Sequence, residues 1–203
     1  MTRIIGGTAG GRRLRTPVGD ATRPTSDRVR EALFSALESR LGSLSGLAVL
    51  DLYAGSGAVG LEAVSRGAAY ARLVEHDRRT ARLISTNAAD LGFADRTAVT
   101  ARTVAAVVAG AADRGYDVVF ADPPYDVPTS AVDEVLVAVV AGGWLAPDAL
   151  VVVERSKRGA APRWPEGLEP LRPKAYGETT LHWAQLPAQP GDEQADEPAR
   201  DLG

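Results

Sequence analysis

The feature that most constrains the fold is a regular alternation of short apolar runs with helical stretches between residues 47 and 154. The runs have the length and composition of buried strands: LAVLDLY (47–53), AYARLVE (69–75), TAVTA (97–101), YDVVFAD (116–122) and ALVVVE (149–154). The stretches between them have helical character and span 58–67, 78–91, 103–114 and 130–141. This alternation predicts a mostly parallel sheet with helices on both faces. Because crossovers are right-handed, the expected fold is a doubly wound, Rossmann-like α/β sheet.

The two ends of the chain depart from this alternation. Near the start, RIIGG, TAG and GRRLRTP predict a β-hairpin with a glycine-rich turn. A helix follows, capped by Thr25 or Ser26 with Asp27 in its first turn. One face of that helix carries Val29, Leu33, Ala36 and Leu37.

Residues 168–176 and 178–186 predict a second hairpin, hinged at Gly177, that adds an antiparallel edge to the sheet. The chain from Pro187 onward is rich in Pro, Ala and acidic residues, so we expect it to be disordered. The expected organisation is a basic N-terminal hairpin and linker over 1–24, one α/β domain over 25–186 and an acidic tail over 187–203.

Composition excludes several classes of protein. The 203 residues, of which 45% are hydrophobic, suffice for one globular core. No apolar run approaches the roughly 20 residues of a membrane span, and the N-terminus lacks the apolar segment of a signal peptide. Cysteine is absent and there are two histidines, which excludes disulfides and thiol catalysis and leaves little material for a metal site. We therefore expect a soluble cytoplasmic protein without a metal or a membrane partner.

Charge is unevenly distributed along the chain. Residues 1–40 carry eight arginines against four acidic residues, whereas residues 186–203 carry five acidic residues against one arginine. The overall net charge of -3 therefore conceals a basic head and an acidic tail. Arginine suits phosphate recognition because its planar guanidinium donates several hydrogen bonds at once.

The first predicted strand ends in the segment DLYAGSGAVG (51–60), which contains the pattern G-x-G-x-x-G. This pattern between a strand and a helix is typical of dinucleotide sites. Asp51 opposes a pyrophosphate but favours a ligand with an ammonium group, such as S-adenosylmethionine. The alternative is a tight turn that only caps the helix. The candidate cofactor residues in this loop are Asp51, Tyr53, Ala54, Gly55 and Gly57.

The second predicted strand ends in Val74-Glu75-His76-Asp77. An acid about 20 residues after a glycine loop accepts hydrogen bonds from both hydroxyls of a ribose. Glu75 is our candidate for this role, with His76 beside it, although a solvated His76 is the alternative. Asp77 is expected to cap the next helix. A ribose site fits both adenosylmethionine and NAD.

The fourth predicted strand ends in Asp122-Pro123-Pro124-Tyr125. Two consecutive prolines have no N–H to donate, so the segment presents carbonyl acceptors, to which Asp122 adds a carboxylate. Such a site suits a planar exocyclic amine with two N–H donors. Tyr125 is placed to stack on a flat base. The alternative is a rigid Pro-Pro turn with a capping aspartate.

These motifs resemble the class I adenosylmethionine-dependent methyltransferases that methylate amines. Five segments in order resemble one of their families more closely, the RsmD family: RIIGGTAGGRRLRTP with RPTSDRVREALF, LDLYAGSGAVGLEAVSRGA, VEHD, DPPY and AYGETTL. Members of that family methylate the exocyclic N2 of a guanine in 16S ribosomal RNA. The resemblance covers residues 1–186 and excludes the acidic tail.

The resemblance implies a seven-stranded sheet with an antiparallel seventh strand, S-adenosylmethionine as methyl donor and S-adenosylhomocysteine as product. It implies 16S ribosomal RNA, within a small-subunit particle, as partner. The N-terminal hairpin then helps to bind RNA, with phosphate contacts from Arg3, Arg12, Arg13 and Arg15 and with Arg23 and Thr25 near the mouth of the active site. A solvated basic face is the alternative for this cluster.

One position departs from the wider class. Many class I methyltransferases have an acid after the third strand, whereas this chain has Thr100-Ala101-Arg102-Thr103. We expect backbone groups near Arg102 and Thr103 to contact the adenine instead. The other functions considered are adenine-N6 methylation of a nucleic acid, a nicotinamide-dependent oxidoreductase and a non-catalytic RNA-binding assembly factor.

Overall fold

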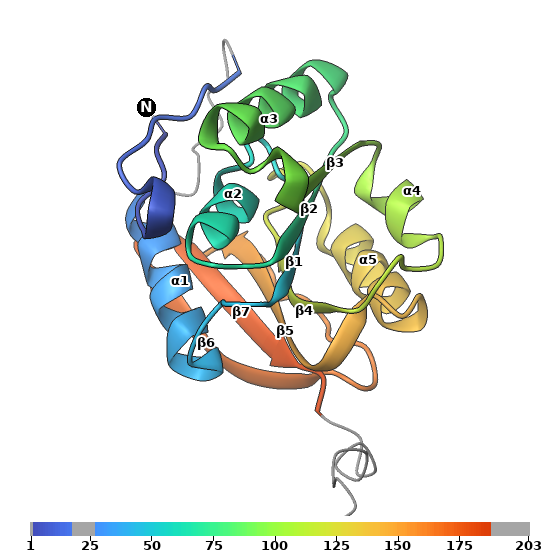
Figure 1. Ribbon diagram of the computed structural model, residues 1–203. Coiled ribbons are helices and arrows are strands. Elements are labelled where there is room, and N and C mark those ends of the chain that lie inside the picture. The colour runs from blue at the N-terminus through green and yellow to red at the C-terminus, as the bar shows by residue number, and fades with distance from the viewer. Residues whose placement is uncertain (1, 18–26, 188–203) are drawn as a thin grey trace, which may run out of the picture.

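A single mixed sheet forms the centre of the molecule. A computed structural model describes residues 2–17 and 27–187. The strands within these residues are β1 (Ala48–Leu52), β2 (Tyr70–Glu75), β3 (Thr97–Ala101), β4 (Tyr116–Ala121), β5 (Leu145–Ser156), β6 (Glu169–Tyr176) and β7 (Thr179–Gln185). Their order across the sheet is β3-β2-β1-β4-β5-β7-β6 (Figure 1). Strands β1 to β5 pair in parallel, and β7 is antiparallel to both of its neighbours. The predicted doubly wound α/β sheet is confirmed.

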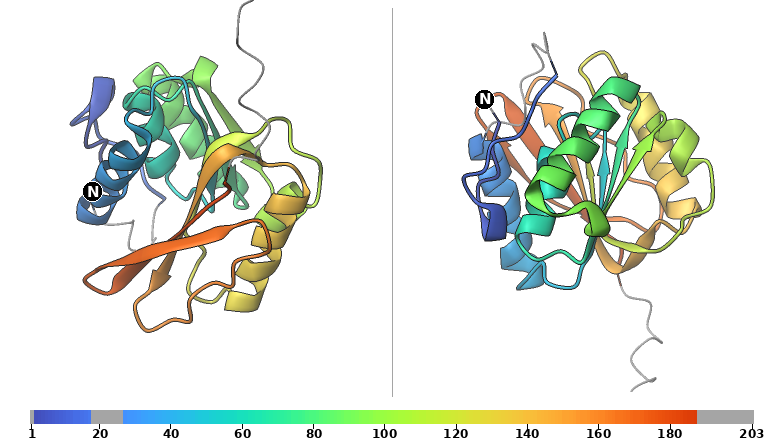
Figure 2. Two further views of the ribbon diagram at one scale, coloured as in Figure 1. Left: turned by 90° about the horizontal axis from the view of Figure 1, so that it is seen from below. Right: turned by 45° about the horizontal axis from the view of Figure 1, so that its top comes forward.

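Helices cover both faces of this sheet (Figure 2). They are α1 (Asp27–Leu41), α2 (Ala58–Ser65), α3 (Arg78–Leu91), α4 (Val104–Val108) and α5 (Thr129–Ala141). One apolar cluster lies beneath α1, α2 and α3 and includes Phe34, Leu61 and Ile84. A second cluster lies beneath α4 and α5 and includes Val107 and Leu136. None of the helices in the described ranges is both long and apolar enough to cross a bilayer.

Helix α4 is shorter than the helix expected over 103–114, and that expectation was wrong. The helix ends at Val108, and the chain then passes through Gly110. From Gly110 onward, the backbone forms hydrogen bonds with the segment before β5. The Trp144 side chain donates through Nε1 to the Gly110 carbonyl at 3.3 Å, and Ala112 N donates to the Gly142 carbonyl at 3.1 Å. These contacts replace the helical hydrogen bonds and direct the chain into β4.

The C-terminal hairpin is confirmed, with Gly177 in its turn at φ 61°. Its second strand, β7, enters the sheet beside β5, where Val152 faces Trp183, and β6 forms the outer edge. Strand β5 begins before the expected ALVVVE run and ends two residues after it. Trp183 and Leu181 are fully buried, so the hairpin extends the core under α1.

The N-terminal segment has less strand pairing than the hairpin we expected. It contains one antiparallel bridge, between Arg3 and Arg13, and a 3-10 turn, η1 (Gly7–Ala9). The amides between these elements bond to α2 instead: Ile5 N donates to Glu62 Oε2 at 2.7 Å and Gly6 N to Glu62 Oε1 at 2.8 Å. The Glu62 carboxylate thus takes the place of the carbonyl acceptors that a longer strand ladder would supply.

Three apolar side chains of this segment, Ile4, Ala9 and Leu14, are buried in the cluster beneath α1 to α3. Figure 1 shows the segment lying along α1 and beside α2. The carboxylate of Glu62 is fully buried there and also contacts Arg66 Nε at 2.9 Å and Arg30 Nε at 3.4 Å. The segment is therefore held both by apolar burial and by a buried charge network.

Candidate active site

The three predicted motifs lie at the carboxyl ends of three adjacent strands. Strand β1 lies between β2 and β4, and Leu52 is in register with Val74 on one side and Ala121 on the other. The chain leaves β1 toward β2 and returns on the other side of β1 as β4, so the order of strands reverses between β1 and β4. Such a switch point is where open α/β sheets bind ligands. The sheet thus brings Asp51, Glu75 and Asp122 to one edge.

The loop after β1 has an unusual backbone. Tyr53 has φ 64°, a left-handed conformation that is costly for a residue with a side chain. Gly55 has φ 53°, and a Cβ placed on it would meet no atom within 4 Å. A Cβ on Gly57 would instead lie 2.8 Å from the Ile84 side chain. Gly55 therefore faces open space at the strand ends, whereas Gly57 allows α2 and α3 to pack closely.

Asp51 lies near the end of β1, and its side chain is buried against the first turn of α2. Its side chain is almost fully inaccessible, and its Oδ2 accepts a hydrogen bond from Gly60 N at 2.9 Å. Burial raises the pKa of Asp51 to about 7, although the Gly60 N–H opposes this shift; the charges of Asp122 and Glu75 raise it further. The charges of Glu75 and Asp122 thus disfavour ionisation of Asp51, and a cation at this edge favours it.

Glu75 connects the ends of β2 and β1. Its Oε2 accepts from Gly55 N at 3.0 Å and its Oε1 from Asp77 N at 2.8 Å. His76 is exposed, with Nδ1 3.0 Å from Glu75 Oε1. Asp77 caps α3 by accepting from Thr80 N at 2.8 Å, which confirms its expected role and lowers its pKa. The ribose contact expected of Glu75 and the cofactor contact expected of His76 stay predictions.

The loop after β4 presents acceptors and one aromatic ring. Asp122 is half-buried and Pro123 is buried, but Tyr125 is 74% exposed. The Pro124 carbonyl accepts from Val127 N at 3.0 Å and closes a turn. The Pro123 carbonyl accepts no hydrogen bond from any residue in the described part of the chain. Tyr125 thus offers a free aromatic face to a planar ligand, and the buried Pro123 carbonyl retains its capacity to accept a hydrogen bond.

Arg155, at the carboxyl end of β5, was not among the residues singled out from the sequence. Its Nη2 donates to the Val127 carbonyl at 3.2 Å and so fixes the turn that follows Tyr125. Its charge also lowers the pKa of His182 on β7, in addition to the larger effect of burial there. The signal for this residue was its place directly after the ALVVVE run, at the same edge as the other motifs.

The residues expected to contact adenine lie where β3 meets α4. Both Arg102 and Thr103 are exposed. Thr103 is the cap of α4, because its Oγ1 accepts from Ala106 N at 3.3 Å. Within the residues described, no group of acidic and histidine side chains is arranged to hold a metal ion.

The arginines of the N-terminal segment are exposed but mostly paired. Arg3 Nε lies 3.4 Å from Asp27 Oδ2, and Arg15 Nη2 lies 3.2 Å from Asp90 Oδ2. Arg12 Nη2 donates to the Asp90 carbonyl at 2.6 Å. Arg13 has no such partner in the described ranges. The predicted cap and RNA-binding residues at 23–26 lie outside the described residues, as does the tail from 188.

A glycine loop after β1, an acid after β2 and a D-P-P-Y turn after β4, on a sheet with an antiparallel β7, define the class I adenosylmethionine-dependent methyltransferases. Within this class, the chain belongs to the family described as "Conserved hypothetical protein 95", whose sequence profile matches residues 2–185.

Individual relatives agree with this assignment. The chain is 36% identical over 196 residues to the Escherichia coli K12 protein named "Ribosomal RNA small subunit methyltransferase D", and the match covers 96% of this chain and 94% of that protein. The solved structure of the Escherichia coli yhhF protein has a TM-score of 0.81 at 36% identity and covers 93% of this chain and 99% of that one. The structure of a Thermus thermophilus protein has a TM-score of 0.74 at 34% identity, with coverages of 90% and 98%.

Proposed function

We propose that this protein transfers a methyl group from S-adenosylmethionine to the exocyclic N2 amine of a guanine in 16S ribosomal RNA. One observation carries the proposal: the strand ends bring together three acidic residues, Asp51, Glu75 and Asp122, beside a glycine that faces open space. The name of the Escherichia coli relative supports the small-subunit RNA as substrate.

The chain's residues fit this cofactor better than a nicotinamide dinucleotide. The open space at Gly55 admits a ligand against the backbone, and Glu75 lies beside it as an acceptor for ribose hydroxyls. An acidic edge attracts a cation but repels a pyrophosphate. Adenosylmethionine has a sulfonium and an ammonium group, and it supplies an electrophilic methyl group when bound. The proposed cofactor site is formed by Asp51, Tyr53, Ala54, Gly55, Gly57, Glu75, His76, Arg102 and Thr103.

The residues after β4 hold the substrate. The Asp122 carboxylate and the Pro123 carbonyl accept the two hydrogens of the exocyclic amine, which directs the nitrogen lone pair toward the cofactor side. Tyr125, with most of its surface free, stacks on the base. Much of the rate enhancement comes from this alignment. The proton that the amine loses passes to Asp122 or directly to water.

A base within folded RNA must leave its stack to enter such a site. Of the proposed RNA-binding residues, Arg3, Arg12, Arg13 and Arg15 lie on the N-terminal segment, where they are exposed to solvent. Arg23 and Thr25 complete the set. The proposed substrate is the 16S rRNA within a small-subunit particle, and the proposed location of the protein is accordingly the cytoplasm.

The test is incubation of the protein with tritiated adenosylmethionine and small-subunit particles that lack the modification, followed by mass mapping of the labelled nucleoside. We expect N2-methylguanosine at one position of 16S rRNA. Free 16S rRNA, tested in parallel, determines whether the assembled particle is required. Label in N6-methyladenosine would show that the methylated base is adenine and not guanine. Retention of NAD in place of adenosylmethionine in dialysis would show that the protein is not a methyltransferase.

A further inference from the structure

Helix α3 has three arginines in its N-terminal half that the proposed site does not use. Arg78, Arg79 and Arg82 are all exposed. In the described part of the chain, none of their guanidinium groups forms an ion pair or a hydrogen bond with another residue. Arg72, by comparison, is paired with Asp113 at 2.8 Å.

Their positions are unfavourable for the helix itself. The N-terminus of a helix carries partial positive charge, so cations in the first turn cost roughly 0.3–1 kcal/mol each. Arg78 and Arg79 occupy the first turn of α3, which contains no acidic residue after the Asp77 cap. Arg78 and Arg79 thus add positive charge to an already positive helix terminus, where the described acidic side chain is that of the Asp77 cap, and an anionic ligand would lower the repulsion further.

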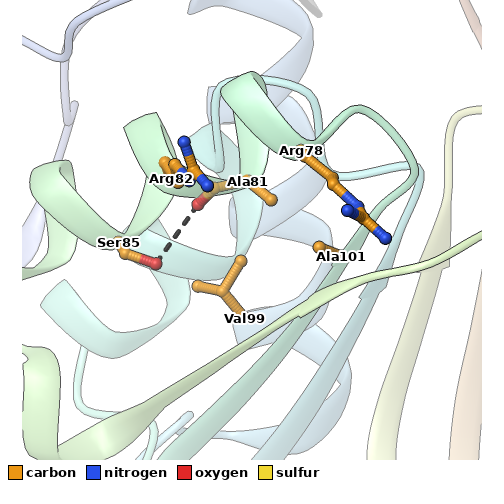
Figure 3. A pocket seen from close by; sticks show the side chains of 6 residues that line it. All are labelled: Arg78, Ala81, Arg82, Ser85, Val99 and Ala101. Carbon is orange, nitrogen blue, oxygen red and sulfur yellow. Dashed lines mark hydrogen bonds between the residues drawn. The ribbon is translucent and has the colours of Figure 1, made fainter.

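A groove lies directly beside these arginines. It has a volume of about 220 Å³ and is lined by Arg78, Arg82 and Ser85 of α3 together with Val99 and Ala101 of β3. Figure 3 shows the Arg78 side chain extending from α3 over the end of β3 near Ala101. Because β3 is the outermost strand on this side, the groove is open along the edge of the sheet.

Helix α3 also joins the candidate active site to the N-terminal segment. It begins just after Glu75 and the Asp77 cap, at the edge of the candidate active site. It ends near Asp90, to which Arg12 and Arg15 of the N-terminal segment bind. A helix of 14 residues is about 21 Å long. Arginines therefore occur at both ends of one flank that runs from the active site to the N-terminal segment.

We propose that the surface formed by Arg78, Arg79, Arg82 and the α3–β3 groove binds the sugar–phosphate backbone of the RNA substrate at the β3 edge of the sheet, away from the nucleotide that enters the active site at β4. This inference rests on the proposed function for the identity of the RNA. The unpaired arginines complement the charge of a polyanion. A protein of net charge -3 can bind a polyanion only through a local basic surface of this kind. In this proposal the arginines contact the phosphate, and Val99 and Ala101 in the groove contact the sugar.

The test compares two double variants of the full-length protein. Arg78→Gln with Arg82→Gln removes two charges from the proposed surface. Arg172→Gln with Lys174→Gln removes two exposed charges from β6, at the opposite edge of the sheet. Binding of free 16S rRNA is measured over a series of salt concentrations, and adenosylmethionine binding is measured by calorimetry.

We expect the α3 variant to bind RNA more weakly, with a log–log salt slope shallower by about 1.4–1.8 for two lost phosphate contacts. The β6 variant should keep the wild-type slope, and both should bind the cofactor normally. A wild-type slope in the α3 variant would overturn the proposal, and so would a loss of cofactor affinity, because the arginines would then belong to the cofactor site. If the wild-type protein binds RNA with this α3 dependence but methylates none, the proposed function fails and the surface stands.

Discussion

At the scale of single residues, Asp51 makes the stability of the protein depend on pH. Its pKa is about 7 in the folded protein against 3.8 for the ordinary carboxyl. At a pH between these two pKa values, Asp51 is protonated in the folded protein and ionised in the unfolded chain. Unfolding then releases a proton, so the free energy of unfolding falls as pH rises from about 4 to 7, by about 1.4 kcal/mol for each unit of pKa difference.

The substitution Asp51→Asn should remove this dependence, because an amide oxygen can still accept from Gly60 N but does not titrate. Urea unfolding at several pH values between 4 and 8, without cofactor, measures the difference. We expect the wild type to lose stability relative to the variant as pH rises. Parallel curves for the two proteins would show that Asp51 is already ionised in the folded state.

Asp122 is expected to act on the substrate and not on the cofactor. Asp122→Ala should lower the rate of methyl transfer by about 100-fold or more, the scale of a lost acceptor or proton-transfer group, while calorimetry finds little change in adenosylmethionine binding. Asp122→Asn keeps one acceptor oxygen and loses the charge. A loss as large as that of the alanine variant would assign proton acceptance to Asp122. Lost cofactor binding in both variants would instead place Asp122 in the cofactor pocket.

At the scale of secondary-structure elements, Arg155 links β5, the turn after Tyr125 and β7. The substitution Arg155→Met removes the hydrogen bond to the Val127 carbonyl and the positive charge near His182. We expect slower methyl transfer from the misplaced turn and a raised pKa of His182, because the charge that opposes its protonation is gone.

Proton NMR can follow this pKa directly, since the chain has two histidines and His76 is exposed. Arg155→Lys is the matched control, because it keeps the charge while losing the guanidinium fork. It should leave the His182 pKa near that of the wild type and still slow methyl transfer. An unchanged His182 pKa in the methionine variant would show that the charge of Arg155 does not act on β7.

Glu62 joins α2 to the N-terminal segment and to α1. Glu62→Gln removes the buried one of the two carboxylate partners of Arg30, leaving the half-exposed Asp27, and weakens the acceptors of Ile5 N and Gly6 N. Breaking a buried pair costs about 3–5 kcal/mol, whereas an exposed pair contributes about 0–1 kcal/mol. Glu38→Gln, which removes a more exposed partner of Arg66, is the control. Equal urea midpoints for the two variants would contradict this account.

At the scale of the whole molecule, the periodicity of the sequence was enough to predict the central sheet and the edge at which its motifs meet. The TAVTA run became β3 without change, because its flanking residues end the apolar pattern on both sides. Helix α4 was overestimated because Ala109, Ala111 and Ala112 favour a helix locally, and contacts with residues 142 and 144 override this preference. The raised pKa of Asp51 and the hydrogen bond from Arg155 to Val127 depend on neighbours distant in sequence, so the apolar runs placed both residues at strand ends but did not indicate these interactions.

The N-terminal segment illustrates the same limit and supports the last prediction. From the sequence it was a basic hairpin with little core of its own, and every proposed cofactor residue lies beyond position 50. In the structure, Ile4 and Leu14 are buried, and the burial of each such side chain contributes about 1.5–3 kcal/mol. Deleting residues 2–16 also removes the two backbone amides that donate hydrogen bonds to Glu62.

Because domains of this kind are stable by only about 5–15 kcal/mol, we expect the deletion of residues 2–16 to lower the thermal midpoint strongly. Arg12→Gln with Arg13→Gln keeps the buried side chains and should unfold near the wild-type midpoint. A deletion variant as stable as the full-length protein would show that the segment is a detachable RNA-binding extension.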